Sequence, residues 1–281
     1  MANYPDNWVD DGNIWCYYNV TTTESATTLG TNTNRASAMW VDGEPVTPAN
    51  SYTFDTIGEH LVKFTPAQWG RYYFSNSQAL VRCYLPTSIT YIDDNSFGGC
   101  GNLTLLNFNS LSITRLGQQA FMGCSNLVMD NLSLPLLDTL GNGALAGCRK
   151  LTSIANLGSI TSLGAYSFNG CTSLASIVLP ATLTSLGNYL FPNSLKTVTS
   201  LAETPPTLGS GVFSAAPTAI YVLPSSVQAY KEAAGWSSYA NKIYPLWEEA
   251  PIAINHMSLG DFRRRIMAGI STPNRIVPAA D

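Results

Sequence analysis

Six cysteines, two histidines and three pairs of adjacent carboxylates are the side chains of this 281-residue sequence that could do chemistry. Thiolates act as nucleophiles or soft metal ligands, histidines as bases or ligands, and paired carboxylates as acid and base in hydrolysis. Apart from Cys16 and Cys83, the cysteines recur at spacings of 24, 24 and 23 residues, as Cys100, Cys124, Cys148 and Cys171. Neither a C-x-x-C pair nor a Cys/His cluster accompanies them, so no metal site is predicted.

The acidic pairs and the histidines do not combine into a catalytic centre either. The pairs are Asp10-Asp11, Asp93-Asp94 and Glu248-Glu249, and adjacent residues on a strand point to opposite faces. His60 lies in an apparent strand and His256 is far away in the sequence. Phosphate-binding, nucleophile-elbow and dinucleotide motifs are absent. We therefore predict a protein that is not an enzyme, with no cofactor, and the turn at Asp93-Asp94 leaves weak Ca²⁺ binding as an alternative.

The cysteine spacing belongs to an internal repeat. The string Phe-x-Gly-Cys-x-(Asn/Ser)-Leu occurs at 97–103, 121–127 and 168–174, and Leu145 replaces Phe in the copy around Cys148. A Leu-Gly pair keeps the same period, at Leu116-Gly117, Leu140-Gly141, Leu163-Gly164, Leu186-Gly187 and Leu208-Gly209. Degenerate copies flank the series, so about six turns run from roughly 74 to 217.

Each unit predicts short strands joined by turns. Apolar residues alternate with polar ones in brief runs, and the glycine after the second leucine would supply a permissive backbone for a turn. A unit of about 23 residues cannot bury its own apolar face, so the copies must stack into a solenoid with a column of Leu, Ile and Phe inside. The four in-register cysteines would form a structural ladder of buried thiols in this core, with disulfides between adjacent coils as the alternative.

The pattern resembles the BspA-like branch of the leucine-rich repeats, whose unit is L-x-x-I-x-L-P-x-x-L-x-x-L-G-x-x-x-F-x-G-C-x-x-L. Residues 174–191 fit this unit position by position, and the resemblance extends from 74 to about 246. It implies an α/β repeat solenoid of short strands with turns or short helices. It also implies a non-enzymatic, curved surface for a protein or glycan ligand, found mostly on surface or adhesion proteins of anaerobic gut bacteria and on their phages. The stretch 218–250 is similar to the family's terminal cap, with Tyr230 and Trp236 placed to cover the last coil.

Residues 1–73 differ in composition from the repeats, with 12 aromatic residues, and no Trp occurs between 70 and 235. β-rich segments and turn signals predict a small antiparallel module that caps the first coil of the 74–217 repeats. The alternative is an aromatic platform for a glycan or peptide, formed by Trp8, Trp15, Trp40 and Trp69.

After the cap, residues 251–281 form a tail. Ser258 to Asp261 has the spacing of a capping box, which predicts a short helix over 262–267. The tail could be solvated, docked on its own protein, or anchored in a groove of a partner subunit; the anchoring residues would be Phe262, Arg263, Arg264, Arg265 and Ile266. Three arginines are too few to bind nucleic acid or anionic lipid strongly through charge.

Composition restricts the partners and the location. Charged residues make up 11% of the chain and the net charge is -4, which excludes an electrostatic footprint for nucleic acid. A run long enough for a membrane-spanning helix is absent. The first residues lack a secretory signal, so the location stays open between the cell surface, which the resemblance implies, and a virion. We expect a binding or adhesion module, or alternatively a structural virion component (a phage decoration, fibre or receptor-binding protein) anchored through its tail.

Overall fold

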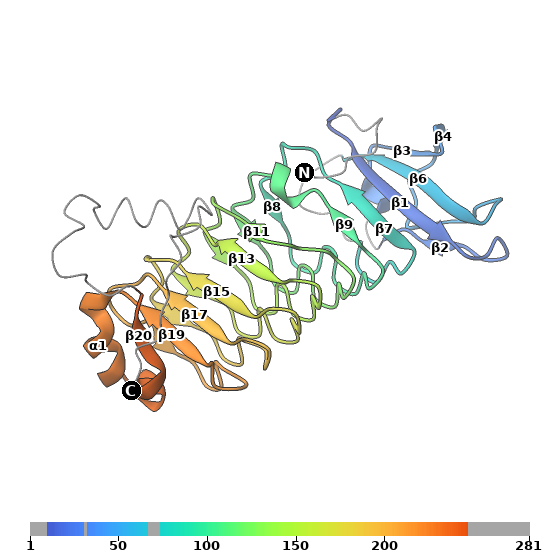
Figure 1. Ribbon diagram of the computed structural model, residues 1–281. Coiled ribbons are helices and arrows are strands. Elements are labelled where there is room, and N and C mark those ends of the chain that lie inside the picture. Colours follow the sequence, from blue (N-terminus) through green and yellow to red (C-terminus); the bar gives the residue numbers. More distant parts are fainter. Residues whose placement is uncertain (1–9, 31–32, 67–73, 247–281) are drawn as a thin grey trace.

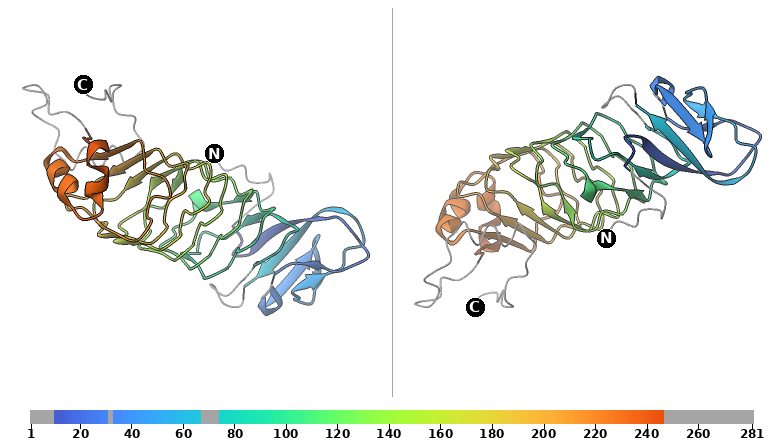
Figure 2. Two further views of the ribbon diagram at one scale, coloured as in Figure 1. Left: turned by 90° about the horizontal axis from the view of Figure 1, so that it is seen from below. Right: turned by 90° about the horizontal axis from the view of Figure 1, so that it is seen from above.

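A computed structural model describes residues 10–30, 33–66 and 74–246, and these form an elongated molecule (Figure 1). A β module lies at the N-terminal end, a column of stacked coils follows it, and a small helical unit closes the other end (Figures 1 and 2). None of the helices among these residues is long and apolar enough to cross a membrane.

The N-terminal module is an antiparallel sheet that continues into the first coils. Its main strands are β1 (Ile14–Val20), β3 (Ala38–Val41), β4 (Glu44–Val46) and β6 (Gly58–Thr65). Strand β1 also pairs antiparallel with β7 (Leu80–Tyr84), which pairs parallel with β9 (Leu105–Leu106), so the order is β4-β3-β6-β1-β7-β9. The short strands β2 (Thr27–Thr28) and β5 (Ser51–Tyr52) pair separately, and η1 (Thr33–Arg35) is a 3-10 turn. Main-chain pairing therefore joins the module to the solenoid.

The coils contribute strands to two parallel six-stranded sheets. One sheet consists of two-residue strands: β8 (Tyr91–Ile92), β10 (Arg115–Leu116), β12 (Thr139–Leu140), β14 (Ser162–Leu163), β16 (Ser185–Leu186) and β18 (Thr207–Leu208). The other consists of β11 (Leu132–Ser133), β13 (Ser153–Asn156), β15 (Ser176–Leu179), β17 (Thr197–Ser200), β19 (Ala219–Val222) and β20 (Ile243–Pro245). Equivalent residues of neighbouring coils pair, as Leu163 does with Leu186. The repeat solenoid of short strands expected from the sequence is confirmed, and the structure adds that the strands of neighbouring coils are parallel.

Phenylalanine rings form a column in the core between the two sheets. Phe97 and Phe121 stack with their centroids 5.1 Å apart, and Phe168 and Phe191 stack at 5.9 Å. Leu145 replaces a ring between these two pairs and is fully buried. Each ring contacts its neighbours in adjacent coils, so the core is continuous although no single unit could form it.

The coils contain less helix than the expected α/β class implies. Across residues 74–217, all of which are described, the helical segment is the 3-10 turn η2 (Phe108–Ser110). Helices do not form because two residues in most coils have a left-handed backbone conformation, for example Gln119 at φ 55° and Gly123 at φ 77°. Such residues end a right-handed helix. The repeat is thus a solenoid of strands and turns.

The glycines of the two sequence markers have different roles, and the expected turn role of the Leu-Gly glycine is wrong. The φ angles of this series lie outside the left-handed region, in contrast to the Phe-x-Gly-Cys glycines such as Gly170, at φ 75°. A Cβ atom on Gly187 would lie 2.5 Å from the backbone nitrogen of Ala165 in the preceding coil. The Leu-Gly glycine is required because two backbones approach closely there.

The closing unit covers the last coil with two aromatic side chains. It contains η3 (Pro224–Ser226), α1 (Val227–Glu232), η4 (Trp236–Lys242) and β20. Tyr230 and Trp236 are fully buried, and the Trp236 indole packs edge-on against Phe213. The Trp236 Nε1–H donates a 2.7 Å hydrogen bond to the carbonyl of Pro206.

Candidate functional site

The four in-register cysteines form a buried ladder whose thiols bond to the neighbouring coil. Each Sγ–H donates to a carbonyl of the preceding coil: Cys100 to Phe74 (2.9 Å), Cys124 to Phe97 (3.0 Å), Cys148 to Phe121 (3.3 Å) and Cys171 to Leu145 (3.1 Å). Burial raises the pKa of Cys100 and Cys171 to about 12. A protonated, buried thiol is a poor nucleophile, so the ladder serves packing.

The remaining two cysteines face each other across the junction of module and solenoid. Cys16 of β1 is paired in register with Cys83 of β7, and their sulfurs are 3.4 Å apart. Both are free thiols and fully buried. Burial raises the pKa of Cys83 well above its ordinary value. The pair therefore contributes apolar packing between the module and the first coil.

The acidic pair of the first full repeat contacts the coil that follows it. Asp93 and Asp94 lie 3.6 and 3.4 Å from the Arg115 guanidinium, and Asp94 also accepts the Gln118 backbone N–H at 2.7 Å. His60 is buried, with its Nδ1 2.7 Å from the Asp42 carboxylate. Among the residues that the structure describes, no three His, Cys, Asp or Glu side chains converge as metal ligands would.

Two of the four tryptophans considered as a platform lie within the described ranges, and a lysine occupies the space between them. Trp15 and Trp40 are both cross-strand neighbours of Lys63, whose Nζ lies 5.2 and 5.5 Å from the two ring centroids. Trp15 is only 8% exposed and its Nε1–H donates to Asp11. These contacts give Trp15 a packing role. Trp8 and Trp69 lie outside the described residues, as do the tail residues Phe262, Arg263, Arg264, Arg265 and Ile266.

Asp11 makes the stability of this aromatic face dependent on pH. Burial raises the pKa of Asp11, but hydrogen bonds from Lys63, Asn13 and Trp15 outweigh it and lower the pKa from 3.8 to about 2. The stabilisation is complete above pH 4 and is lost as the pH falls from about 4 to about 2, because the unfolded chain binds the proton more tightly. We expect a loss of about 1 to 2 kcal/mol, given that the side chain is 27% exposed.

Thermal unfolding of the wild type and of Asp11→Asn from pH 2 to pH 7 measures this contribution. The melting temperatures should differ above pH 4 and converge towards pH 2. Asp10, whose pKa is also lowered by hydrogen bonds from Thr87, titrates in both proteins; its contribution cancels except for the small effect of the Asp11 charge on its pKa. Parallel curves over the whole range would contradict the role of Asp11.

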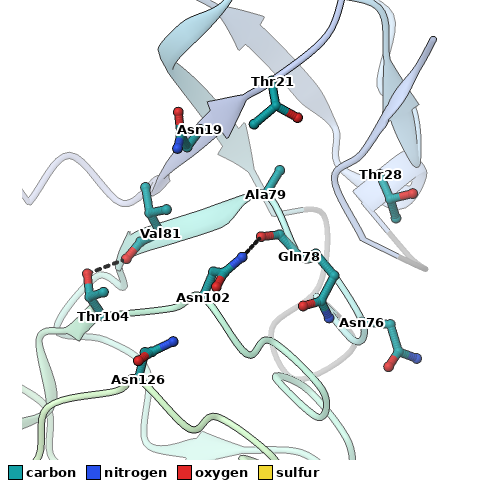
Figure 3. A pocket seen from close by; sticks show the side chains of 10 residues that line it. All are labelled: Asn19, Thr21, Thr28, Asn76, Gln78, Ala79, Val81, Asn102, Thr104 and Asn126. Carbon is teal, nitrogen blue, oxygen red and sulfur yellow. Dashed lines mark hydrogen bonds between the residues drawn. The ribbon is translucent and has the colours of Figure 1, made fainter.

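An uncharged cavity lies where the module meets the first coils, and we call it the junction pocket (Figure 3). Its volume is about 580 Å³. The module contributes residues from the end of β1, the following loop and β2, and the solenoid contributes residues from β7 and the turns of three coils. The lining residues are Asn19, Thr21, Thr28, Asn76, Gln78, Ala79, Val81, Asn102, Thr104 and Asn126.

Hydrogen bonds between coils hold the amides of this pocket in place. Asn102 Nδ2 donates to the Gln78 carbonyl at 2.9 Å (Figure 3), and Asn126 Nδ2 donates to the Gly101 carbonyl at 2.8 Å. Thr104 Oγ1 donates to the Val81 carbonyl at 2.8 Å. The two Asn side-chain oxygens accept no hydrogen bond from the described residues. They therefore remain as acceptors for a ligand.

Sequence reasoning missed this site. Asn102 and Asn126 occupy the (Asn/Ser) slot of the repeat, and Asn76 and Gln78 lie in the degenerate first copy. Asparagine at this slot in two successive coils was a visible signal. Nothing in the sequence indicated that Asn19 lines the pocket, because its position depends on how the module pairs with the solenoid.

Comparison with known proteins agrees with this fold. The family model described as "BspA type Leucine rich repeat region" matches in six copies, over residues 61–171 and 138–234. No curated protein matches the sequence. Leucine-rich repeat proteins of this type generally act as binding modules, are generally not enzymes and are typically associated with surfaces.

Two solved structures are similar to parts of the chain. The T. pallidum leucine-rich repeat protein TpLRR is 24% identical, with a TM-score of 0.41, and the match covers 50% of this chain and 78% of that one. A leucine-rich repeat protein from Bacteroides ovatus ATCC 8483 is 19% identical, with a TM-score of 0.30, over 53% of this chain and 51% of that one. With six matched repeat copies spanning more than half of its length, the chain belongs to the BspA type leucine-rich repeat family.

Proposed function

We propose that this protein is a non-enzymatic binding module that takes a neutral glycan in the junction pocket. The observation that supports the proposal is the lining, which consists of amide, hydroxyl and small apolar side chains without a single ionisable group. Sugar hydroxyls both donate and accept hydrogen bonds, and Asn, Gln and Thr side chains do the same. The volume of about 580 Å³ is within the usual range for small-molecule sites.

The charge of the solenoid favours the same class of ligand. Only nine charged side chains occur between Phe74 and Leu201, five basic and four acidic. Specificity on such a surface must come from shape and hydrogen bonding, since long-range attraction is weak. We place the module at a cell surface in this proposal because proteins of the family are typically found there. A protein ligand is the competing outcome of the test below.

A tryptophan at the pocket mouth should block the site without disturbing the fold. Thr21 lines the pocket, is exposed and makes no side-chain hydrogen bond with the described residues. Thr23 is exposed on the same loop but does not line the pocket. We expect Thr21→Trp to weaken glycan binding at least tenfold, whereas Thr23→Trp should bind as the wild type does.

The measurement is calorimetric titration with neutral hexasaccharides, namely maltohexaose, cellohexaose, xylohexaose and mannohexaose. Equal melting temperatures for the three proteins would confirm that folding is unchanged. Equal affinities of Thr21→Trp and wild type would refute the junction pocket as the site. Failure of every hexasaccharide to bind the folded wild type, together with capture of a surface protein, would replace the glycan with a protein ligand.

A further inference from the structure

Two tyrosines on adjacent coils form a half-exposed aromatic pair away from the junction pocket. Tyr166 and Tyr189 occupy equivalent positions, two residues before Phe168 and Phe191. Their rings stack with centroids 5.3 Å apart and an interplanar angle of 20°. The two residues are 48% and 47% exposed, among the most exposed large apolar residues in the described part of the chain.

The backbone at this position is unfavourable for tyrosine. Tyr166 has φ 61° and Tyr189 has φ 49°, in the left-handed region where a bulky side chain is an outlier. The equivalent position in the other coils holds residues better suited to this region or less bulky, namely Asn95, Gln119, Gly143 and Gly211. Strained residues held in place by their surroundings concentrate at functional sites. The backbone conformation of the repeat therefore does not explain why tyrosine occupies this position in two coils.

Glycines on both sides make room for the pair. A Cβ atom on Gly211 would lie 2.8 Å from the Tyr189 ring, so that ring covers Gly211 on one side and stacks with Tyr166 on the other. The coil that precedes Tyr166 carries Gly143, which has no side chain, at the equivalent position. Gln119 leans over Gly143, with its Cγ 3.4 Å from where a Cβ would be. Neighbouring parallel strands are about 4.8 Å apart, so the face of Tyr166 and the Gln119 amide are within reach of one small ring.

Two side-chain amides near the tyrosine pair could form hydrogen bonds with such a ring, and the coils of the two tyrosines contain no charged side chain. The Gln119 side chain makes no hydrogen bond with the described residues. Asn142 uses its Oδ1 to accept the Ala165 N–H at 2.9 Å, which leaves its NH₂ group as a donor. Residues 151–195, which include both tyrosines, contain no Asp, Glu, Lys, Arg or His. An anionic or cationic partner would find no counter-charge in the two coils that carry the tyrosines.

We propose that Tyr166 and Tyr189, with the amides of Gln119 and Asn142, form a second subsite for a neutral sugar ring. The apolar C–H face of the sugar packs on the open side of the tyrosine pair, and its hydroxyls bond to the two amides. The inference rests on the proposed glycan-binding function and adds a site that is separate from the junction pocket.

The test replaces both tyrosines with the residue that another coil uses at this position. Tyr166→Asn/Tyr189→Asn should keep or raise the melting temperature, because asparagine tolerates the left-handed backbone. Titration with the four neutral hexasaccharides should give two sites in the wild type, and the double variant should lose the second or weaken it at least tenfold. The matched control is Tyr221→Thr/Tyr244→Thr, which removes a tilted tyrosine pair from regular strands and should retain both sites.

The outcomes separate this inference from the proposed function. Loss of one site in Thr21→Trp with full binding in the tyrosine variant would overturn the second subsite and leave the junction pocket standing. Loss of binding in the tyrosine variant, with full binding in Thr21→Trp, would support the subsite and refute the junction pocket as a glycan site. A fall of several degrees in melting temperature with unchanged affinity would show that the pair is only structural, and binding to neither site would overturn both.

Discussion

Gly187→Ala is expected to lower the free energy of unfolding by about 3 kcal/mol. The added Cβ would lie 2.5 Å from the backbone nitrogen of Ala165 and 2.7 Å from the carbonyl carbon of Gly164. Overpacking a well-packed interior costs about 1 to 3 kcal/mol. The upper end applies because the opposing atoms are backbone and cannot move aside as a flexible side chain would. The two coils must separate, which weakens the parallel pairing of β14 with β16.

Urea denaturation followed by circular dichroism measures this loss, and Gly101→Ala is its control. Gly101 is a turn glycine of the same solenoid outside the left-handed region; the nearest atom to its Cβ would be the Gln78 side-chain oxygen at 3.4 Å, and the next nearest would be 3.9 Å away. That substitution should change the free energy of unfolding by no more than about 0.5 kcal/mol. Similar effects of the two substitutions would show that close approach of coils is not what the Leu-Gly glycine permits.

The same glycines show how far a sequence can be interpreted alone. Spacing predicted the stacked repeat, because a residue type that recurs every 23 or 24 positions must face its own copies in a solenoid. It could not distinguish a glycine needed for its φ angle from one needed for its missing side chain. Gly170 and Gly187 are equally regular, yet only Gly170 has a left-handed backbone.

The candidate sites were harder to predict than the fold. The junction pocket combines Asn19 with Asn126, which are far apart in sequence, and depends on the pairing of β1 with β7. No periodic signal connects the module with the repeats. Tyr166 and Tyr189 are visible in the sequence. However, the residue type at their repeat position differs from coil to coil, so the repeat pattern does not mark this position as functional. The tryptophans were conspicuous in composition, yet Lys63 fills the space between Trp15 and Trp40.

Trp236→Ala is expected to cost about 3 to 5 kcal/mol, the usual range for truncating a large buried aromatic residue. Trp236 is fully buried and packs edge-on against Phe213 and Tyr230. Its loss opens a cavity at the end of the phenylalanine column and leaves the Pro206 carbonyl without its donor. Because each coil is stabilised chiefly by its neighbours, the damage should be local. Hydrogen exchange should accelerate first in β18 and β19 and much later in β8 and β10.

Two further variants separate the cavity from the hydrogen bond. Trp236→Phe keeps most of the ring volume but removes the indole N–H that bonds to Pro206 at 2.7 Å, so it should cost about 1 to 2 kcal/mol. Tyr244→Ala, at a half-exposed position of β20, should cost less than about 1 kcal/mol. Tyr244→Ala is therefore expected to be the most stable of the three variants, Trp236→Phe less stable, and Trp236→Ala the least stable. If Trp236→Ala were as stable as Tyr244→Ala, or if exchange rose uniformly along the coils, Trp236 would not be the residue that closes the solenoid. The order is expected because no further coil packs on the last one, so Trp236, with Tyr230 beside it, must supply contacts that a next coil would otherwise make.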